Sequence, residues 1–178
     1  MKKSVTFILI FLLVISTAVY GYNYSRLQSV MDNLIAADDK NEGIQVSVHY
    51  DNYFNPLVLV FDLQFVAERK SMADVFRIFL QFAQKKQFEK FKAIKLSFRG
   101  KTKFIINGGY FRELGREYLW QNPDFTMKDF PLHLKTPDGS EVYPQLPRQG
   151  DFAWVSRKQL QNFNDFIKKW YREDLDRR

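Results

Sequence analysis

The longest uninterrupted run of apolar positions lies at the start of the chain. Lys2 and Lys3 precede an uncharged stretch from Val5 to Val19. A short basic start followed by an apolar segment and small residues is typical of an export signal. Because the lysines hold the N-terminus inside, the pattern predicts that residues 1–22 are a signal peptide or membrane anchor and that residues 23–178 form an extracytoplasmic domain.

The length of this run is compatible with either a cleaved signal peptide or a retained membrane anchor. Signal peptides have apolar cores of about 7–15 residues, and Ser16-Thr17-Ala18 supplies small residues for cleavage after Ala18. Continued to Tyr22, the same run approaches the roughly 20 residues that span a bilayer, with Tyr20 and Tyr22 at the interface. A lipid-modified anchor is not expected, since the chain has no cysteine. We expect an exported protein, either periplasmic or anchored in the inner membrane with its C-terminal domain outside the cytoplasm.

Beyond this run, polar and apolar positions alternate with a period of two in several short segments, which predicts half-buried strands. These segments are residues 44–50, 57–65, 94–98, 104–106, 132–134 and 142–143. The third and fourth form a hairpin around the turn Arg99-Gly100-Lys101. Residues 122–131 show no regular pattern, so an irregular connection is expected there.

Apolar residues spaced by three and four predict helices at residues 25–37, 71–86, 110–120 and 156–171. Ser71 with Asp74, and Ser156 with Gln159, have the spacing of capping boxes. Phe79 lies in the middle of the apolar stripe of the second helix, and Leu160 begins that of the last. The order of elements predicts an α+β fold, a single small domain with a mostly antiparallel sheet and helices packed on one face.

The amino-acid composition limits the reactions and the binding partners that can be expected of the protein. The 178 residues suffice for one domain, and the absence of cysteine excludes disulfides, thiol nucleophiles and cysteine-bound zinc. The net charge of +7 suits anionic lipid head groups, acidic polymers or an acidic protein partner. No motif for reading DNA or RNA is present, so nucleic acid is not an expected partner.

Catalytic constellations are sparse. His49 and His133 have no second ligand at a metal-binding spacing, and no nucleotide-binding glycine motif or nucleophile elbow occurs, so neither metal nor cofactor is expected. Gly108-Gly109 only resembles the position of a phosphate-binding turn, and we expect it to supply unusual backbone angles. Asp62 interrupts an apolar strand and is the best carboxylate for hydrolytic chemistry, although simple alternation makes it a solvent-facing strand residue.

A basic belt follows the second predicted helix and consists of Lys85, Lys86, Lys90, Lys92, Lys95, Arg99, Lys101 and Lys103. We expect Lys95, Arg99 and Lys101 to be solvent-facing cross-strand neighbours. They either contact an anionic surface or protect the edge of the sheet from pairing with other chains.

The segment from Tyr110 to Trp120 combines aromatic residues with arginine, a composition enriched at interface centres. On a helix, Phe111, Leu114 and Tyr118 share the inward face, whereas Arg112, Arg116 and Trp120 share another. The hypothesis is that this second group, with Tyr110 beside it, binds a partner. The alternative is that both arginines pair with Glu113 and Glu117 and that Trp120 folds under the following loop.

Taken together, these patterns favour a non-enzymatic interaction or accessory domain of the cell envelope. Its partner is expected to be a protein or an anionic envelope component. A small envelope hydrolase that uses carboxylates, and a secretion or assembly accessory factor, are the alternatives.

Overall fold

The computed structural model of the protein describes residues 2–146 and 152–175. Its main elements are α1 (Lys2–Asn23), η1 (Tyr24–Gln28), α2 (Ser29–Ala36), β1 (Ile44–Asp51), β2 (Asn55–Val66), α3 (Met72–Lys85), β3 (Ala93–Phe98), β4 (Lys101–Asn107), α4 (Gly108–Glu117), α5 (Pro123–Asp129), η3 (Phe130–His133), α6 (Phe152–Ile167), η4 (Lys168–Arg172) and α7 (Glu173–Leu175). A further short turn of helix, η2 (Asp39–Asn41), precedes β1. The expected α+β fold is confirmed.

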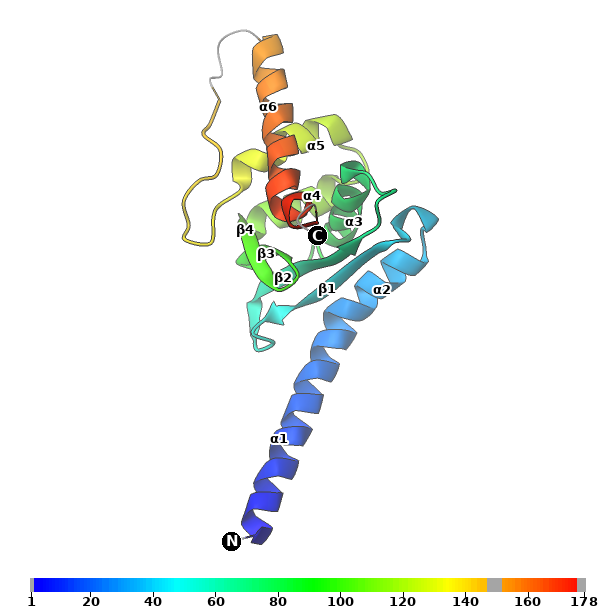
Figure 1. Cartoon of the computed structure of the whole chain (residues 1–178), viewed down its shortest axis with the longest axis vertical. Coiled ribbons are helices and arrows are strands. Elements are labelled where there is room, and N and C mark those ends of the chain that lie inside the picture. The colour runs from blue at the N-terminus through cyan, green and yellow to red at the C-terminus, as the bar shows by residue number, and fades with distance from the viewer. Residues whose placement is uncertain (1, 147–151, 176–178) are drawn as a thin grey trace.

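The four strands of the described residues form one mixed sheet in the order β1-β2-β3-β4. The β1–β2 and β3–β4 pairs are antiparallel, whereas β2 and β3 are parallel and are connected through α3. The hairpin turn at Arg99-Gly100 lies where it was expected, and Gly100 takes the positive φ of 81° that such a turn favours. Because β2 runs antiparallel to β1, its first residues lie beside the exit of α1 and its last residues lie at the opposite end (Figure 1).

Aromatic side chains fill the core between the sheet and the helices α3, α4 and α6–η4. The ring of Phe61 on β2 packs edge-on against Phe79 of α3 at 5.1 Å and lies 6.1 Å from Trp170 of η4. The indole N–H of Trp170 donates to the backbone oxygen of Ser97 on β3, so the last helix is fastened to the sheet by a buried hydrogen bond of 3.0 Å. The stripe predicted for α3 is buried as expected, and Ser71 and Asp74 form the predicted capping box.

The N-terminal helix is continuous from α1 through η1 into α2 and lies along the open edge of β1 (Figure 1). Gln28 bonds both an N–H and a carbonyl of that edge: its Oε1 accepts from Val48 N (2.8 Å) and its Nε2 donates to Val46 O (3.1 Å). Asn23 does the same further along, accepting from Tyr50 N. Backbone groups of an edge strand would otherwise be open to pairing with another chain, so the helix closes this edge.

Several expected elements differ from the structure. The helix expected at 25–37 is a continuation of α1 rather than a separate helix. The irregular stretch contains α5, which Asn122 caps by accepting from Asp124 N, and the strands expected at 132–134 and 142–143 are replaced by η3 and isolated bridges of Lys135. Ser156 lies inside α6 rather than at its start, and Leu160 is 44% exposed rather than buried.

Candidate functional site

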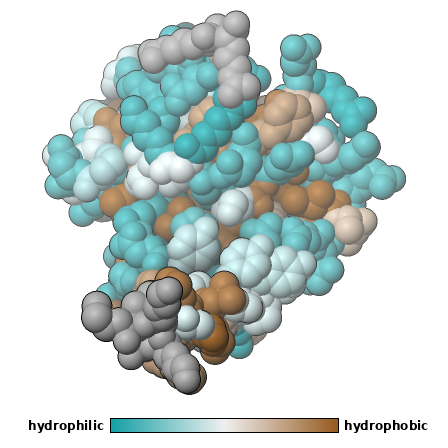
Figure 2. Space-filling view, turned by 60° about the horizontal axis from the view of Figure 1, so that its bottom comes forward, coloured by the Kyte–Doolittle hydropathy of each residue, from teal (hydrophilic) through white to brown (hydrophobic). Residues whose placement is uncertain are grey.

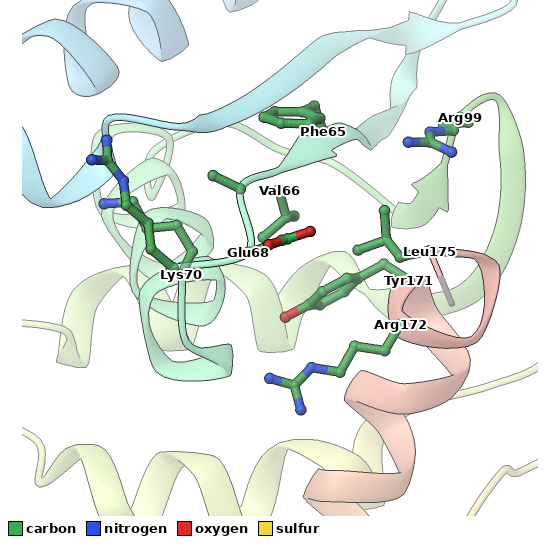
Figure 3. Close-up of a pocket in the computed structure, with 10 residues that line it drawn as sticks. Phe65, Val66, Glu68, Lys70, Arg99, Tyr171, Arg172 and Leu175 are labelled. Carbon is green, nitrogen blue, oxygen red and sulfur yellow. The ribbon is translucent and has the colours of Figure 1, made fainter. Parts of the chain in front are cut away.

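A cavity of about 940 Å³ opens where β2 ends and the C-terminal helix meets the sheet. Three segments far apart in the sequence line it: residues 65–70, Arg99 of the β3–β4 turn, and the residues Tyr171, Arg172 and Leu175. In Figure 3, Arg99 and Lys70 lie on opposite sides of the cavity, and Arg172 extends into it from the C-terminal helix. We call this cavity the cationic cleft.

Positive charge dominates the lining of the cationic cleft. Arg69, Lys70, Arg99 and Arg172 contribute four cations, and Glu68 is the one carboxylate among the lining residues. Arg69 is partly neutralised by an exposed ion pair with Glu42 at 3.3 Å. No ion pair of Lys70, Arg99 or Arg172 with a carboxylate occurs among the described residues. The cleft therefore offers uncompensated charge to an anion.

Arg99 is held in place from two sides. Its guanidinium lies 4.8 Å from the ring centre of Phe98, and its Nε donates to the backbone oxygen of Gln64 at 3.2 Å. Its backbone has a φ of 49°, an uncommon value for a residue with a side chain. Lys70 is likewise held by donating to the backbone oxygen of Lys40 at 3.0 Å. These cations are thus positioned without being neutralised.

Tyr171 forms the wall between these cations. Its side chain is buried, and its hydroxyl lacks a hydrogen-bond partner among the described residues. Burial raises the pKa of Tyr171, while the charge of the neighbouring Arg172 acts in the opposite direction. A neutral phenol beside an arginine is a hydrogen-bond donor for an anion, so this hydroxyl adds a polar contact to the charged lining.

The basic belt does not form one continuous surface. Lys95 pairs with Asp51 at 2.7 Å, Lys103 pairs with Asp174 at 2.6 Å, and Lys86 is buried. The expectation that Lys95, Arg99 and Lys101 are cross-strand neighbours is wrong, because the register places Lys95 opposite Ile105 and Lys101 opposite Phe98. Arg99 faces the cationic cleft, Lys101 is exposed in the turn, and Lys95 is a partly buried ion-pair partner at the other end of the sheet.

Of the three residues expected to form one stripe, Arg112 and Arg116 lie on α4, whereas Trp120 lies in the turn after the helix ends at Glu117. Arg112 is partly buried and donates to the backbone oxygen of Phe91 at 3.2 Å. Arg116 is exposed, and Trp120 is 69% exposed and donates its indole N–H to Arg116 O. Neither arginine forms an ion pair in the described residues, so the alternative pairing with Glu113 and Glu117 is absent.

Tyr110 belongs to a different cluster. Its ring stacks on His133 at 3.6 Å, and its hydroxyl donates to Asp129, which also bonds His133. Burial and the charge of Asp129 raise the pKa of Tyr110 well above its ordinary value. Burial opposes ionisation of Asp129, but the hydrogen bond and charge of His133 and the hydrogen bond from Tyr110 together outweigh it, so the pKa of Asp129 is lowered. Tyr110 therefore joins α4 to the end of α5.

The carboxylate considered for hydrolysis has a structural role. Asp62 is buried rather than solvent-facing, and both of its oxygens accept from the backbone N–H of Gly100, at 3.1 and 2.9 Å. Gln64 donates a further hydrogen bond of 2.6 Å. Its oxygens are thus used to hold the β3–β4 turn, and the expected exposed position was wrong because this turn folds back over the outer face of the sheet. His49, which lies opposite Val60 on the neighbouring strand, stacks on Tyr53 at 4.5 Å.

A second, apolar hollow of about 400 Å³ lies between α3, α4 and α5 beside the exposed end of α4. Phe76, Leu80, Leu114 and Leu119 are among the residues that line it. No group of three or more metal-ligating side chains occurs among the described residues. No protein-family model, curated protein or solved structure matches the chain.

Sequence reasoning predicted a binding role for Arg99, which lines the cationic cleft, but it did not single out Arg69, Lys70, Arg172 or Tyr171. Arg69 and Lys70 follow the predicted strand 57–65, and their position just beyond its end was the only local signal. Arg172 and Tyr171 belong to the end of the last helix, more than a hundred residues away in the chain. Only the parallel β2–β3 pairing and the packing of η4 on β3 bring these segments together.

Proposed function

We propose that the protein is a membrane-anchored, non-enzymatic interaction domain of the cell envelope that binds an anionic envelope component in the cationic cleft. The observation that carries the proposal is the cleft itself, in which four cationic side chains, one carboxylate and a buried phenol surround a cavity. The ligand chemistry that fits is carboxylate or phosphate, since arginine binds both through planar paired donors.

The position of the cleft supports a tethered role. The helix from Lys2 to Ala36 contains a segment long and apolar enough to be a signal or an anchor. About ten residues of β2 separate the strand's start, beside the exit of α1, from the cleft at its end, which is roughly 33 Å at the usual rise of a strand. An anchored domain would therefore hold the cleft well away from the bilayer, where it can reach soluble or wall-bound anions.

Export and retention of the anchor are tested first. A reporter enzyme that is active only outside the cytoplasm, fused after residue 178, should show activity, whereas a reporter that functions only in the cytosol should not. The full-length mass of the protein isolated from membranes should include residues 1–22. A cytosolic reporter signal contradicts export, and a mature N-terminus at Val19 contradicts the anchor.

Binding is tested with the full chain in lipid nanodiscs, using fluorescent polyglutamate and polyphosphate as separate probes. Arg99→Asn combined with Arg172→Ser should weaken binding at least about tenfold, because two of the uncompensated cations are lost; asparagine tolerates the positive φ at position 99. The matched control combines Arg157→Ser with Lys158→Ser, which removes two exposed cations of α6 outside the cleft.

The control should bind like the unmodified chain, and binding should weaken as salt rises, because exposed charges are screened over about 8 Å at physiological ionic strength. Preference for one probe identifies the carboxylate or the phosphate class. Equal losses in both variants would show a nonspecific effect of net charge. Absence of binding to either probe at low salt would overturn the role of the cleft.

A protein partner at α4 is the second candidate. Arg116 and Trp120 are both exposed, and their sequence neighbours Glu117 and Leu119 line the apolar hollow between α3, α4 and α5. Tryptophan and arginine are enriched where interfaces bind most strongly.

A further inference from the structure

The tip of the β1–β2 hairpin lies directly beside the point where the apolar segment of α1 ends. Asn23 follows Tyr22, and its Nδ2 donates a 2.9 Å hydrogen bond to the backbone oxygen of Tyr53 in the hairpin turn. Twenty helical residues are about 30 Å long, which matches the hydrocarbon thickness of a bilayer. If a bilayer embeds residues 3–22, its surface therefore lies at the level of this turn.

The turn presents aromatic side chains at that level. Phe54 is 70% exposed, and Tyr53 beside it is also exposed. Asn52 and Tyr53 both have positive φ, 50° and 64°, and the second of these positions ordinarily favours glycine. The Tyr53 ring stacks on His49, which together with the bond to Asn23 holds the strained turn. The chain thus places the exposed Tyr53 at a position that glycine adopts more easily, and the exposed Phe54 directly after it.

A third exposed aromatic residue lies in the loop between α3 and β3, at the same end of the sheet. Phe88 is 86% exposed. Its neighbour Glu89 forms an ion pair of 2.9 Å with Arg26, and Lys86 donates to the backbone oxygen of Arg26. Arg26 lies four residues, about 6 Å along the helix, beyond Tyr22. The loop is therefore fastened about one helical turn above the end of the apolar segment.

Exposed lysines lie at the end of α3 and in the α3–β3 loop, on either side of Phe88. Lys85, Lys90 and Lys92 are exposed and make no ion pair among the described residues. The nearby carboxylates, Asp51 and Glu89, are already paired with Lys95 and Arg26. Figure 2 looks toward this end of the domain, and shows the hydrophobic surface of α1 in front of a face on which hydrophobic and pale patches alternate with hydrophilic ones.

We infer that Phe54, Phe88, Lys85, Lys90 and Lys92 form a membrane seat on the outer surface of the bilayer that α1 crosses. The aromatic rings enter the headgroup region, where aromatic side chains of membrane proteins gather, and the lysines bind anionic phospholipid headgroups. The inference rests on the anchor of the proposed function and is independent of the cationic cleft, which lies at the opposite end of β2. The seat would fix the tilt of the domain, so that the cleft always points away from the membrane.

The absence of cysteine in the chain allows a direct test. Single substitutions Phe54→Cys, Phe88→Cys and Phe152→Cys are labelled with an environment-sensitive fluorophore, and the full chain is reconstituted in vesicles of phosphatidylcholine and phosphatidylglycerol. Phe152 is the matched control, because it is 85% exposed but lies on α6 at the far end of the domain. Lipids spin-labelled near the headgroup should quench positions 54 and 88 at least about twice as strongly as position 152, given the shallow depth expected of interfacial side chains.

A fourth label, at Leu12→Cys, separates the two proposals because Leu12 lies in the middle of the apolar segment. Strong quenching of position 12 by lipids labelled deep in the acyl chain, with positions 54 and 88 quenched no more than 152, overturns the seat while keeping the anchor. Absence of deep quenching at position 12 overturns the anchor and the seat with it. Replacing Lys85, Lys90 and Lys92 together with Gln should reduce quenching at position 88 in anionic vesicles but leave position 12 unchanged, and an unchanged signal at position 88 would contradict the lysine contacts.

Discussion

The side chain of Asn23 takes the place of a neighbouring strand at Tyr50, its Oδ1 accepting the 2.8 Å hydrogen bond that the Tyr50 backbone N–H would otherwise offer to another chain. The same amide donates to Tyr53 O and to Val19 O. Gln28 repeats the arrangement at Val46 and Val48. One helix thus joins the apolar segment and the sheet edge through side-chain amides, and the orientation of the domain relative to α1 is set by these bonds.

Replacing Asn23 with Ala should lower the free energy of unfolding by about 1–3 kcal/mol, the cost of leaving buried backbone polar groups unpaired. Asn23 is 3% exposed, so water does not readily replace the lost bonds. The measurement is urea unfolding of the full chain in detergent micelles, together with hydrogen exchange at the Tyr50 amide, which should become faster. Asn33→Ala on the exposed side of α2 is the control and should stay within about 0.5 kcal/mol. Equal effects of the two substitutions would show that the edge contact contributes nothing.

This edge contact was beyond the reach of sequence patterns. Asn23 and Gln28 are five residues apart, which places them about 140° apart around a regular α-helix. The wide turn at Tyr24–Gln28 carries hydrogen bonds five residues long and brings both amides to the same side. Such a local change of helix type leaves no periodic signal, so the polar residues after Tyr22 were interpreted as the boundary between an N-terminal segment and a separate helix.

Local patterns were sufficient where an element is determined by its own residues. The capped stripe of α3 and the hairpin around Gly100 were predicted because capping, helical spacing and turn chemistry all act within a few residues. Local patterns gave the wrong surroundings for Asp62 and Lys95. The burial of Asp62 depends on the β3–β4 turn folding over it, and the partner of Lys95, Asp51, lies two strands away. Gly115 weakened the helix prediction, but a side chain there would clash with the Ala83 carbonyl, so glycine allows α4 to approach α3.

Phe79→Ala should destabilise the domain by roughly 3–5 kcal/mol, the usual cost of removing a fully buried aromatic ring. Phe79 is 1% exposed and its ring contacts those of Phe61 and Phe130 at 5.1 and 5.7 Å. Phe88→Ala removes the same side chain from an exposed position and should change stability by less than about 0.5 kcal/mol in micelles. Thermal and urea unfolding of both variants provide the measurement. A melt of the Phe79 variant that matches the unmodified chain would contradict the packing of α3 on the sheet.

Asp62 should give the stability of the domain a distinctive pH dependence. Burial raises its pKa above the ordinary value of 3.8, although the hydrogen bonds from Gly100 and Gln64 act in the opposite direction. Between 3.8 and the raised pKa, the folded protein holds this proton more tightly than the unfolded chain does. The contribution of Asp62 to the free energy of unfolding therefore falls as pH rises through this window and is level above it.

Asp62→Asn removes this contribution, so the stability of the variant relative to the unmodified chain should improve as pH rises through the window. Asp138→Asn is a control of opposite sign, because the hydrogen bond from Thr136 lowers the pKa of Asp138. Its relative stability should worsen as pH rises through the lowered pKa toward the ordinary value. Urea unfolding at several pH values measures both differences. Parallel trends for the two variants would show that Asp62 is not held in a buried, proton-retaining site.

Of Arg112, Arg116 and Trp120, we expect Arg112 to stabilise the fold and the other two to bind a partner. Arg112→Ala should cost about 0.5–1.5 kcal/mol of stability, the usual value of a net hydrogen bond, because Phe91 O loses its donor in a partly buried position. Arg116→Ala and Trp120→Ala should each leave stability within about 0.5 kcal/mol, since both side chains are exposed. The binding stripe expected from the sequence is therefore reduced to the pair Arg116 and Trp120.

If Arg116 and Trp120 bind a protein, each substitution should remove the same cross-linked product when the anchored chain is cross-linked in intact cells and purified. Arg157→Ala on α6 is the matched control, because it deletes another exposed arginine, on a helix that does not line the apolar hollow. The decisive comparison is between product yield and unfolding midpoint measured on the same variants. Loss of the product without a shift in the midpoint supports the interface. If the yield of the product is unchanged by both substitutions, or falls only when the unfolding midpoint also falls, the interface is contradicted. The role of these residues is then structural, with the indole of Trp120 bonded to Arg116 O at the end of the helix.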